Sequence, residues 1–248
     1  MRSVLRKVHA CQRKNSSDTV WSGRQPAQRR LRVLANAVLL GLLFLIPSDR
    51  EPDEIRARAD LLAQAEAALQ HDALQIYTVL KSNAIGLSES SLWDVARTIL
   101  AESRKHAIDP TLVLAMIEVE SSFRHRAVSR RGARGLMQLR PIVAVAFAEE
   151  AEVEIKDAKK SLEDPVVNIR LGVFYLGYLK KIFTDLEVAL TAYNWGPTRV
   201  RKHISSGKEL QRSYASRVLS AYRAYRKEGL LLKGSLPNEQ QKNSAINL

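Results

Sequence analysis

The sequence predicts an all-α protein, and three observations support that fold class. From Glu51 to Lys81 the residues are mostly Ala, Leu, Glu, Gln and Arg, with no Gly or Pro after Pro52, a composition that favours helix. Residues that cap helices well precede several apolar segments farther along, the clearest being Asp109 before Pro110. Val, Ile, Tyr and Phe nowhere alternate with polar residues over the length of a strand.

The N-terminal segment is strongly basic. Residues 1–32 contain nine Lys or Arg and one acidic residue, and the whole chain of 248 residues has a net charge of +13. Most of the excess positive charge therefore lies in residues 1–32, which we expect to be disordered. A basic surface suits any polyanion. However, the sequence has no helix-turn-helix and no basic patch interleaved with aromatic residues, so no nucleic-acid partner is expected.

An apolar segment follows the basic one. The fourteen residues from Val33 to Ile46 are apolar except for Asn36. As a helix they would rise about 21 Å, less than a hydrocarbon core of about 30 Å, and this length is typical of the h-region of a secretory signal. Residues 33–47 are therefore predicted to be a signal h-region, or a signal anchor because no convincing cleavage site follows. A buried core helix is the alternative.

The rest of the chain is predicted to have three parts. Residues 51–84 are a helical spacer, residues 85–228 an all-α domain, and residues 229–248 a flexible tail. Ser91 and Asp164 are expected to cap two helices of the domain. The helices of the domain are expected at 92–106, 110–123, 141–150, 165–183, 185–195, 197–206 and 211–228.

One carboxylate lies on the apolar face of a predicted helix. Glu120 follows Val113, Met116 and Ile117 at the spacing of one buried face, whereas Glu118 lies about 200° away around the helix. Burial raises the pKa of a carboxyl group and can keep it protonated near neutral pH, the state that a general acid needs. The alternative is a Glu at the end of the apolar face that turns toward solvent or pairs with an arginine.

Several segments resemble the catalytic domain of the soluble-type (SLT) lytic transglycosylases, relatives of goose-type lysozyme. They are ESSF at 120–123, AVSRRGARGLMQL at 127–139, DPVVNIRLGVFYLGYL at 164–179 and ALTAYNWGP at 189–197. Any one of these segments alone is weak, but together they occur in the family's order over about residues 98–205. The resemblance implies a lysozyme-like, SLT-type helical catalytic domain, preceded by the signal or anchor segment and the helical spacer.

The resemblance also implies the functional residues. Glu120 would be the catalytic residue, followed by Ser121 and Phe123 as in the family. The implied substrate-binding residues are Ser129, Gly135, Met137, Gln138, Tyr193 and Asn194. Glycines allow positive φ and close approach of a sugar to the backbone. From the residues alone, core filling remains the alternative for Met137 and for Tyr193.

The implied reaction is cleavage of the β-1,4 bond between N-acetylmuramic acid and N-acetylglucosamine in peptidoglycan, with formation of 1,6-anhydromuramic ends. It needs neither a metal nor another cofactor. A hydrolytic lysozyme-like muramidase is the nearest alternative, and a non-catalytic wall-binding module of a secretion apparatus is another. A second acid is not excluded, because acidic residues cluster between Glu149 and Asp157.

The implied partners are glycan strands of peptidoglycan, the inner membrane through residues 33–47, and secretion or cell-wall machinery. We expect an exported, periplasmic protein, anchored in the inner membrane if the signal is uncleaved. The chain departs from the family's pattern at Trp195 and between Arg124 and Arg140, where arginines are frequent. These arginines could meet carboxylates of the substrate's peptide stems or form a solvated basic loop.

Overall fold

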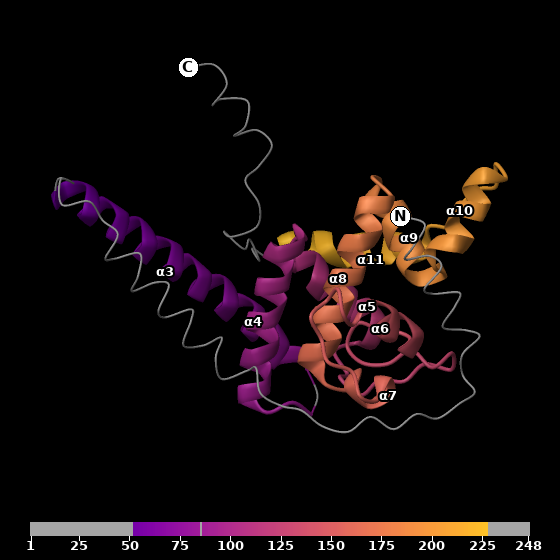
Figure 1. The fold of residues 1–248 in the computed structure, drawn as a ribbon, viewed down its shortest axis with the longest axis horizontal. Coiled ribbons are helices and arrows are strands. Elements are labelled where there is room, and N and C mark those ends of the chain that lie inside the picture. Colours follow the sequence, from indigo (N-terminus) through magenta and orange to yellow (C-terminus); the bar gives the residue numbers. More distant parts are fainter. Residues whose placement is uncertain (1–51, 85, 228–248) are drawn as a thin grey trace, which may run out of the picture. The chain divides into compact units, whose positions relative to one another are not determined.

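The computed structural model describes residues 52–84 and 86–227 (Figure 1). The predictions for residues 1–32, 33–47 and 229–248 lie outside these residues. Within the described ranges the chain is helical, and the β-structure there amounts to two isolated bridges in one loop. The all-α prediction is confirmed.

Nine helices are described in residues 52–84 and 86–227. They are α3 (Pro52–Asn83), α4 (Glu89–His106), α5 (Pro110–Ser121), α6 (Pro141–Phe147), α7 (Ala158–Ser161), α8 (Pro165–Ile182), α9 (Leu186–Trp195), α10 (Pro197–Ser205) and α11 (Ser213–Lys227). None of these described helices has the length and apolar character needed to span a membrane. The short helix α7 was not expected, and α6 ends three residues earlier than predicted.

The helix starts follow the capping residues of the sequence. Asp109 caps α5, since its Oδ1 accepts a hydrogen bond from the Thr111 N–H at 2.8 Å, and Asp164 caps α8 in the same way. Both predicted caps are confirmed. Ser91 was wrongly predicted as the cap of α4: Ser88 has the extended backbone of a cap, and its Oγ accepts from the Ser91 N–H at 3.2 Å.

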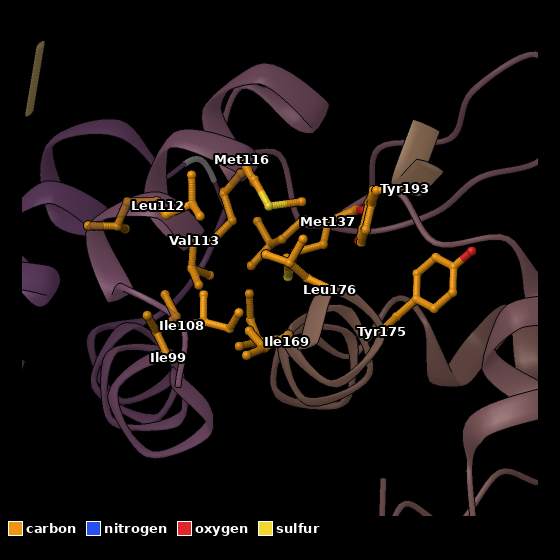
Figure 2. Packing of buried hydrophobic residues seen from close by; sticks show 14 of the residues in the cluster. Ile99, Ile108, Leu112, Val113, Met116, Met137, Ile169, Tyr175, Leu176 and Tyr193 are labelled. Atoms are coloured by element: carbon orange, nitrogen blue, oxygen red, sulfur yellow. The ribbon is translucent and has the colours of Figure 1, made fainter. Parts of the chain in front are cut away.

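Helix α5 lies in the middle of the core. Every residue from Pro110 to Ile117 is buried, so the helix is enclosed on all sides until its last turn. Helices α4 and α11 pack against it. Figure 2 shows Val113 and Met116 of α5 beside Met137 and Leu176. Because so many apolar neighbours surround α5, its direction and its end point are firmly fixed.

Helix α3 changes character along its length. Its second half takes part in the core, where Ile76 and Leu80 are fully buried and Tyr77 stacks on Trp93 with ring centroids 4.2 Å apart. Residues 53–67 are exposed throughout. The predicted spacer is therefore helical, but only its first half has the exposed surface expected of a spacer.

Candidate active site

Glu120 occupies the last turn of α5, where the helix leaves the core. It is half-buried, and its Oε1 accepts a hydrogen bond from the hydroxyl of Tyr214 at 2.7 Å. Glu118 is exposed, as the helical projection predicted. Of the two acidic residues on α5, only Glu120 is therefore drawn into the protein.

The environment of Glu120 raises the pKa of its carboxyl group to about 7. Burial is the main cause, because a carboxylate loses hydration there. The Tyr214 hydroxyl and the positive charge of Arg217 act in the opposite direction, since both stabilise the ionised form. At neutral pH the group is thus close to half protonated, so it can both give up and take up a proton.

The end of α5 is fixed by its backbone. Ser122 and Phe123 both have positive φ, 48° and 60°, so the helix cannot continue. The Phe123 side chain is buried and anchors the chain where it turns away. The Arg124 Nε–H donates to the carbonyl of Ser121 at 3.0 Å, which satisfies one of the helix's free carbonyls. Glu120 is therefore held on a short, well-defined turn.

The loop after α5 folds into a compact ribbon. Arg134 and Leu139 exchange two backbone hydrogen bonds of 2.9 and 3.0 Å, and the Gly135 N–H donates to the Ala127 carbonyl at 3.0 Å. Gly135 has φ +80°, and a Cβ there would lie 2.1 Å from the amide of Asn168. The position therefore requires glycine for both its backbone conformation and its close packing.

Asn168 of α8 holds the ribbon against the core. Its Oδ1 accepts from the Met137 N–H at 2.8 Å, and its Nδ2 donates to the carbonyls of Arg134 and Leu162, each at 2.9 Å. It is fully buried, so all these bonds are shielded from water. The sequence analysis did not single out Asn168, although a lone amide on the apolar face of α8 is a signal for such a role.

Ser129 and Gln138 stabilise the same ribbon. The Ser129 Oγ accepts from the Ala133 N–H at 3.0 Å. The Gln138 Nε2 donates to the carbonyls of Ala127 and Gly135, each at 3.0 Å. Both side chains are half-buried, so each has a structural role in the ribbon and also retains accessible surface.

Met137 and Tyr193 are buried. The Met137 side chain has no exposed surface and packs against Gly172, which favours the core alternative for this residue. Tyr193 is also in the core, and its hydroxyl donates to the Met137 carbonyl at 2.9 Å. Burial raises the pKa of Tyr193 well above its usual range, and the negative charge of Glu120 raises it further. Tyr193 thus lies close enough to Glu120 for the two groups to interact electrostatically.

The sequence analysis missed Tyr214. It is buried at the start of α11, and the guanidinium of Arg217 lies over its ring, 5.9 Å from the ring centroid. The spacing of Tyr214, Val218 and Tyr222 indicates a buried face of α11, which by itself reads as core. Its contact with Glu120 joins residues 94 positions apart, and no local pattern reports such a contact.

The remaining candidates are Asn194 and the acidic residues after α6. Asn194 is exposed at the end of α9. The acidic residues after α6 have other partners: Glu152 pairs with Lys105 at 3.0 Å, and Asp157 caps α7. Among the described residues, no carboxylate is among the groups that shift the pKa of Glu120. In that part of the chain there is also no group of three His, Cys, Asp or Glu side chains that could hold a metal.

The loop arginines do not form one site. Arg134 forms an ion pair with Glu163, whereas Arg126, Arg130 and Arg131 are exposed. A hollow of about 560 Å³ borders His125, Arg126 and Lys160, but Glu120 is not part of its lining. The candidate active site is therefore the carboxyl group of Glu120 with its partners, and this hollow is separate from it.

Comparison with known proteins gives consistent matches. Residues 97–216 match the family model of the transglycosylase SLT domain. Membrane-bound lytic murein transglycosylase C of Shigella sonnei is 35% identical over 115 residues, which cover 43% of this chain and 32% of that protein. The chain thus spans about a third of the length of this relative.

Two solved structures are also similar. One is an inactive mutant of the lytic transglycosylase Slt from Pseudomonas aeruginosa, 30% identical with a TM-score of 0.47, covering 53% of this chain and 24% of that one. The other is the 70 kDa soluble lytic transglycosylase of Escherichia coli, 25% identical with a TM-score of 0.48, covering 56% of this chain and 26% of that one.

Proposed function

We propose that the chain is a peptidoglycan lytic transglycosylase, because residues 97–216 match the family model of the transglycosylase SLT domain. It cleaves the β-1,4 bond between N-acetylmuramic acid and N-acetylglucosamine and leaves 1,6-anhydromuramic ends. The observation that carries the proposal is the half-buried Glu120, whose pKa is raised to about 7 and whose Oε1 meets a tyrosine hydroxyl. A group of this pKa serves as acid and base at the same pH.

In the first step the protonated Glu120 gives its proton to the glycosidic oxygen, and the bond to the muramic anomeric carbon breaks. Positive charge develops on that carbon. The substrate's own 2-acetamido oxygen stabilises it, in place of the second carboxylate that most glycosidases use.

In the second step the ionised Glu120 accepts the proton of the muramic C6 hydroxyl. The C6 oxygen then attacks the anomeric carbon and closes the 1,6-anhydro ring. Because this attack is intramolecular, proximity favours it over attack by water. The hydroxyl of Tyr214 stabilises the carboxylate that exists between the two steps.

The ribbon after α5 would form one wall of the glycan groove. Ser129 and Gln138 offer half-buried polar groups, which suit sugar hydroxyl and acetamido groups. Gly135 is buried and would shape this wall through its backbone conformation. Asn194 would contact the strand from the end of α9. Met137 and Tyr193 would support this wall from inside the core and would not touch the glycan with their side chains, because both side chains are buried. Tyr193 fixes the Met137 carbonyl and thereby the ribbon.

The wall substrate places the protein in the cell envelope, in agreement with the name of the membrane-bound relative. Residues 33–47 would direct export and, if uncleaved, anchor the chain in the inner membrane, where secretion or wall machinery could recruit it. Fractionation of cells that express the full chain tests this. We expect the intact chain in the inner-membrane fraction, and a shortened chain in the soluble periplasmic fraction would show instead that the signal is cleaved.

The reaction is tested by digesting purified sacculi with the full chain and identifying the sugar ends by mass spectrometry. We expect anhydro ends from the wild type and none from Glu120→Gln. Glu118→Gln is the matched control, because Glu118 is exposed on the same helix and its loss should change nothing. Reducing ends from the wild type would favour the hydrolytic alternative, and equal activity of Glu120→Gln would exclude Glu120 as the acid.

A further inference from the structure

Helix α11 contacts α5 at both of its ends. At the C-terminal end of α5, the Tyr214 hydroxyl donates to Glu120 at 2.7 Å. At the N-terminal end, the Tyr222 hydroxyl donates to Oδ2 of Asp109 at 2.6 Å. The two helices therefore run antiparallel along one another, with a tyrosine of α11 on a carboxylate at each end of α5.

The contact at Asp109 is reinforced by a third residue. The Arg226 Nη1–H donates to the Tyr222 hydroxyl at 2.8 Å and lies 3.6 Å from Oδ2 of Asp109. Accepting a bond from a cation makes the tyrosine hydroxyl a stronger donor to the carboxylate. The other oxygen of Asp109 caps α5, so this carboxylate joins the start of α5 to the end of α11.

Between these ends the helices are in close apolar contact. Ala215 and Val218 of α11 are fully buried and lie on the same face as the two tyrosines. The spacing fits the contacts: residues 109 and 120 are about 16 Å apart along α5, and residues 214 and 222 about 12 Å apart along α11, a difference that the length of the side chains covers. Apolar contact tolerates small slides, whereas two directional hydrogen bonds do not.

We propose that Asp109, Tyr222 and Arg226 form a register lock that fixes the position of α11 along α5 and so holds Tyr214 on Glu120. These three are positioning residues, because none of them touches the reacting carboxyl group. A slide of α11 by one residue, about 1.5 Å, would misalign both tyrosine hydroxyls at once. The proposal rests on the assignment of Glu120 as the acid.

Three described side chains interact electrostatically with Glu120. Tyr214 and Arg217 face it from α11, and both lower its pKa against the effect of burial. Tyr193 of α9 is within reach of its charge. Loosening α11 weakens the first two influences together. The lock therefore has a readout that simple packing does not have, namely the pKa of the Glu120 carboxyl group.

The test is a titration of Glu120 by carbon NMR in the full chain, selectively labelled at glutamate side chains. Tyr222→Phe keeps the ring and the cap but removes the bond to Asp109. We expect it to raise the pKa of Glu120 by roughly half a unit and to lower turnover of sacculi about threefold at neutral pH. In a Tyr214→Phe background it should cause a clearly smaller shift, because the Tyr214 contact is already lost and only the influence of Arg217 remains to be weakened.

Two further variants keep the result interpretable. Tyr77→Phe is the matched control, since Tyr77 is a buried tyrosine whose ring stacks on Trp93 of α4 and is not among the groups that shift the pKa of Glu120, and it should leave the titration unchanged. Arg226→Gln removes the guanidinium that donates to Tyr222 but keeps the bond from Tyr222 to Asp109. It should shift the pKa of Glu120 in the same direction as Tyr222→Phe, but by less. An unshifted Glu120 in Tyr222→Phe, or an equal shift in both backgrounds, would overturn the lock.

The titration also separates the lock from the proposed function. If the wild-type chain released no anhydro-muropeptides, the proposed function would fail. The dependence of the pKa of Glu120 on Tyr222 would still be measured in the same samples and would support or overturn the lock by itself.

Discussion

Two glutamates occupy matching places on neighbouring helices but have different partners. Glu102 on α4 and Glu120 on α5 each follow a buried Val by seven residues and a buried Ile by three. Glu102 is 6% exposed, and the Arg170 Nε–H donates to it at 3.2 Å while His106 Nε2 lies 3.4 Å away. Glu120 has a neutral hydroxyl as its hydrogen-bond donor.

The difference shows that burial alone does not give a carboxyl group the role of a general acid; the hydrogen-bond donor beside it also matters. A cation beside a buried carboxylate stabilises its ionised form and fixes it as a structural group. A neutral donor compensates less of the lost hydration, so the pKa of Glu120 stays raised at about 7. Glu102 is therefore tied to Arg170 within the fold, whereas Glu120 has no such cationic hydrogen-bond partner and is able to exchange a proton near neutral pH.

The largest expected effect is on activity. Glu120→Gln should lower release of anhydro-muropeptides at least about a hundredfold, because general acid and base catalysis are both lost. Glu102→Gln should retain wild-type turnover at a temperature where it is folded. Release of soluble muropeptides from sacculi, followed by mass spectrometry, measures both. A large loss in Glu102→Gln, with an unchanged circular dichroism spectrum, would contradict the division of roles.

The second effect is on stability, and the two variants should have opposite signs. In the native state the pKa of Glu120 is about 7 against 4.5 for the free group, so the native state binds more protons between these values and loses stability as the pH rises through them. Glu120→Gln removes this penalty. It should raise the free energy of unfolding by up to about 3 kcal/mol at pH 8 and by little below pH 4.5.

For Glu102→Gln the free energy of unfolding should fall by roughly 1–3 kcal/mol, because Arg170 and His106 lose a charged partner in a mostly buried place. Urea denaturation of both variants at pH 4.5, 6 and 8 checks the pair of predictions. A stabilising Glu102→Gln, or a Glu120→Gln whose effect does not depend on pH, would remove the contrast between the two glutamates.

The same pair defines what could be predicted from the sequence. The starts of helices were well predicted where an aspartate precedes an apolar segment, as at Asp109 and Asp164, because N-capping is a local property. A Val seven residues earlier and an Ile three residues earlier precede both Glu102 and Glu120, and the patterns differ only where Thr98 stands in place of Met116, so periodicity separates the two glutamates only weakly. The neighbouring motifs selected Glu120, and the structure shows that the two glutamates differ in their hydrogen-bond donor, which is Arg170 for Glu102 and Tyr214 for Glu120.

What the sequence could not give are contacts between distant positions. Arg170 reaches Glu102 from α8, and Tyr214 reaches Glu120 from α11, and each pairing depends on how the helices pack. Asn168 was missed for the same reason, since its three partners lie in the ribbon and the turn before α8. The assignment of Met137 suffers from a related problem: a motif names a residue but does not say whether its side chain or its backbone is used.

The third effect is a shift in the pKa of Glu120. Tyr214→Phe removes the hydroxyl that stabilises the ionised carboxyl group, so the pKa should rise above 7 by about one unit. The alkaline limb of the pH–rate profile should move up with it, because the first step needs the protonated acid. Tyr175→Phe is the control, since Tyr175 is a buried tyrosine that packs on Tyr193 and is not among the groups that shift the pKa of Glu120.

A Tyr214→Phe profile with its alkaline limb unchanged would mean that the hydroxyl does not govern the acid. The comparison with Glu102 would then lose its physical basis, because a neutral donor and no donor would be equivalent.

The smallest effect concerns Arg217, which among residues 52–84 and 86–227 is the cation that shifts the pKa of Glu120 from a distance. Arg217 is exposed on α11 and lowers the pKa of Glu120 through its charge, without a contact like that between Arg170 and Glu102. Arg217→Met should raise the pKa of Glu120 by a few tenths of a unit. Because salt screens an exposed charge, the alkaline limb of the wild type should also move up between 0.05 and 0.5 M salt, whereas that of Arg217→Met should stay in place. A variant as salt-sensitive as the wild type would mean that another charge controls the acid.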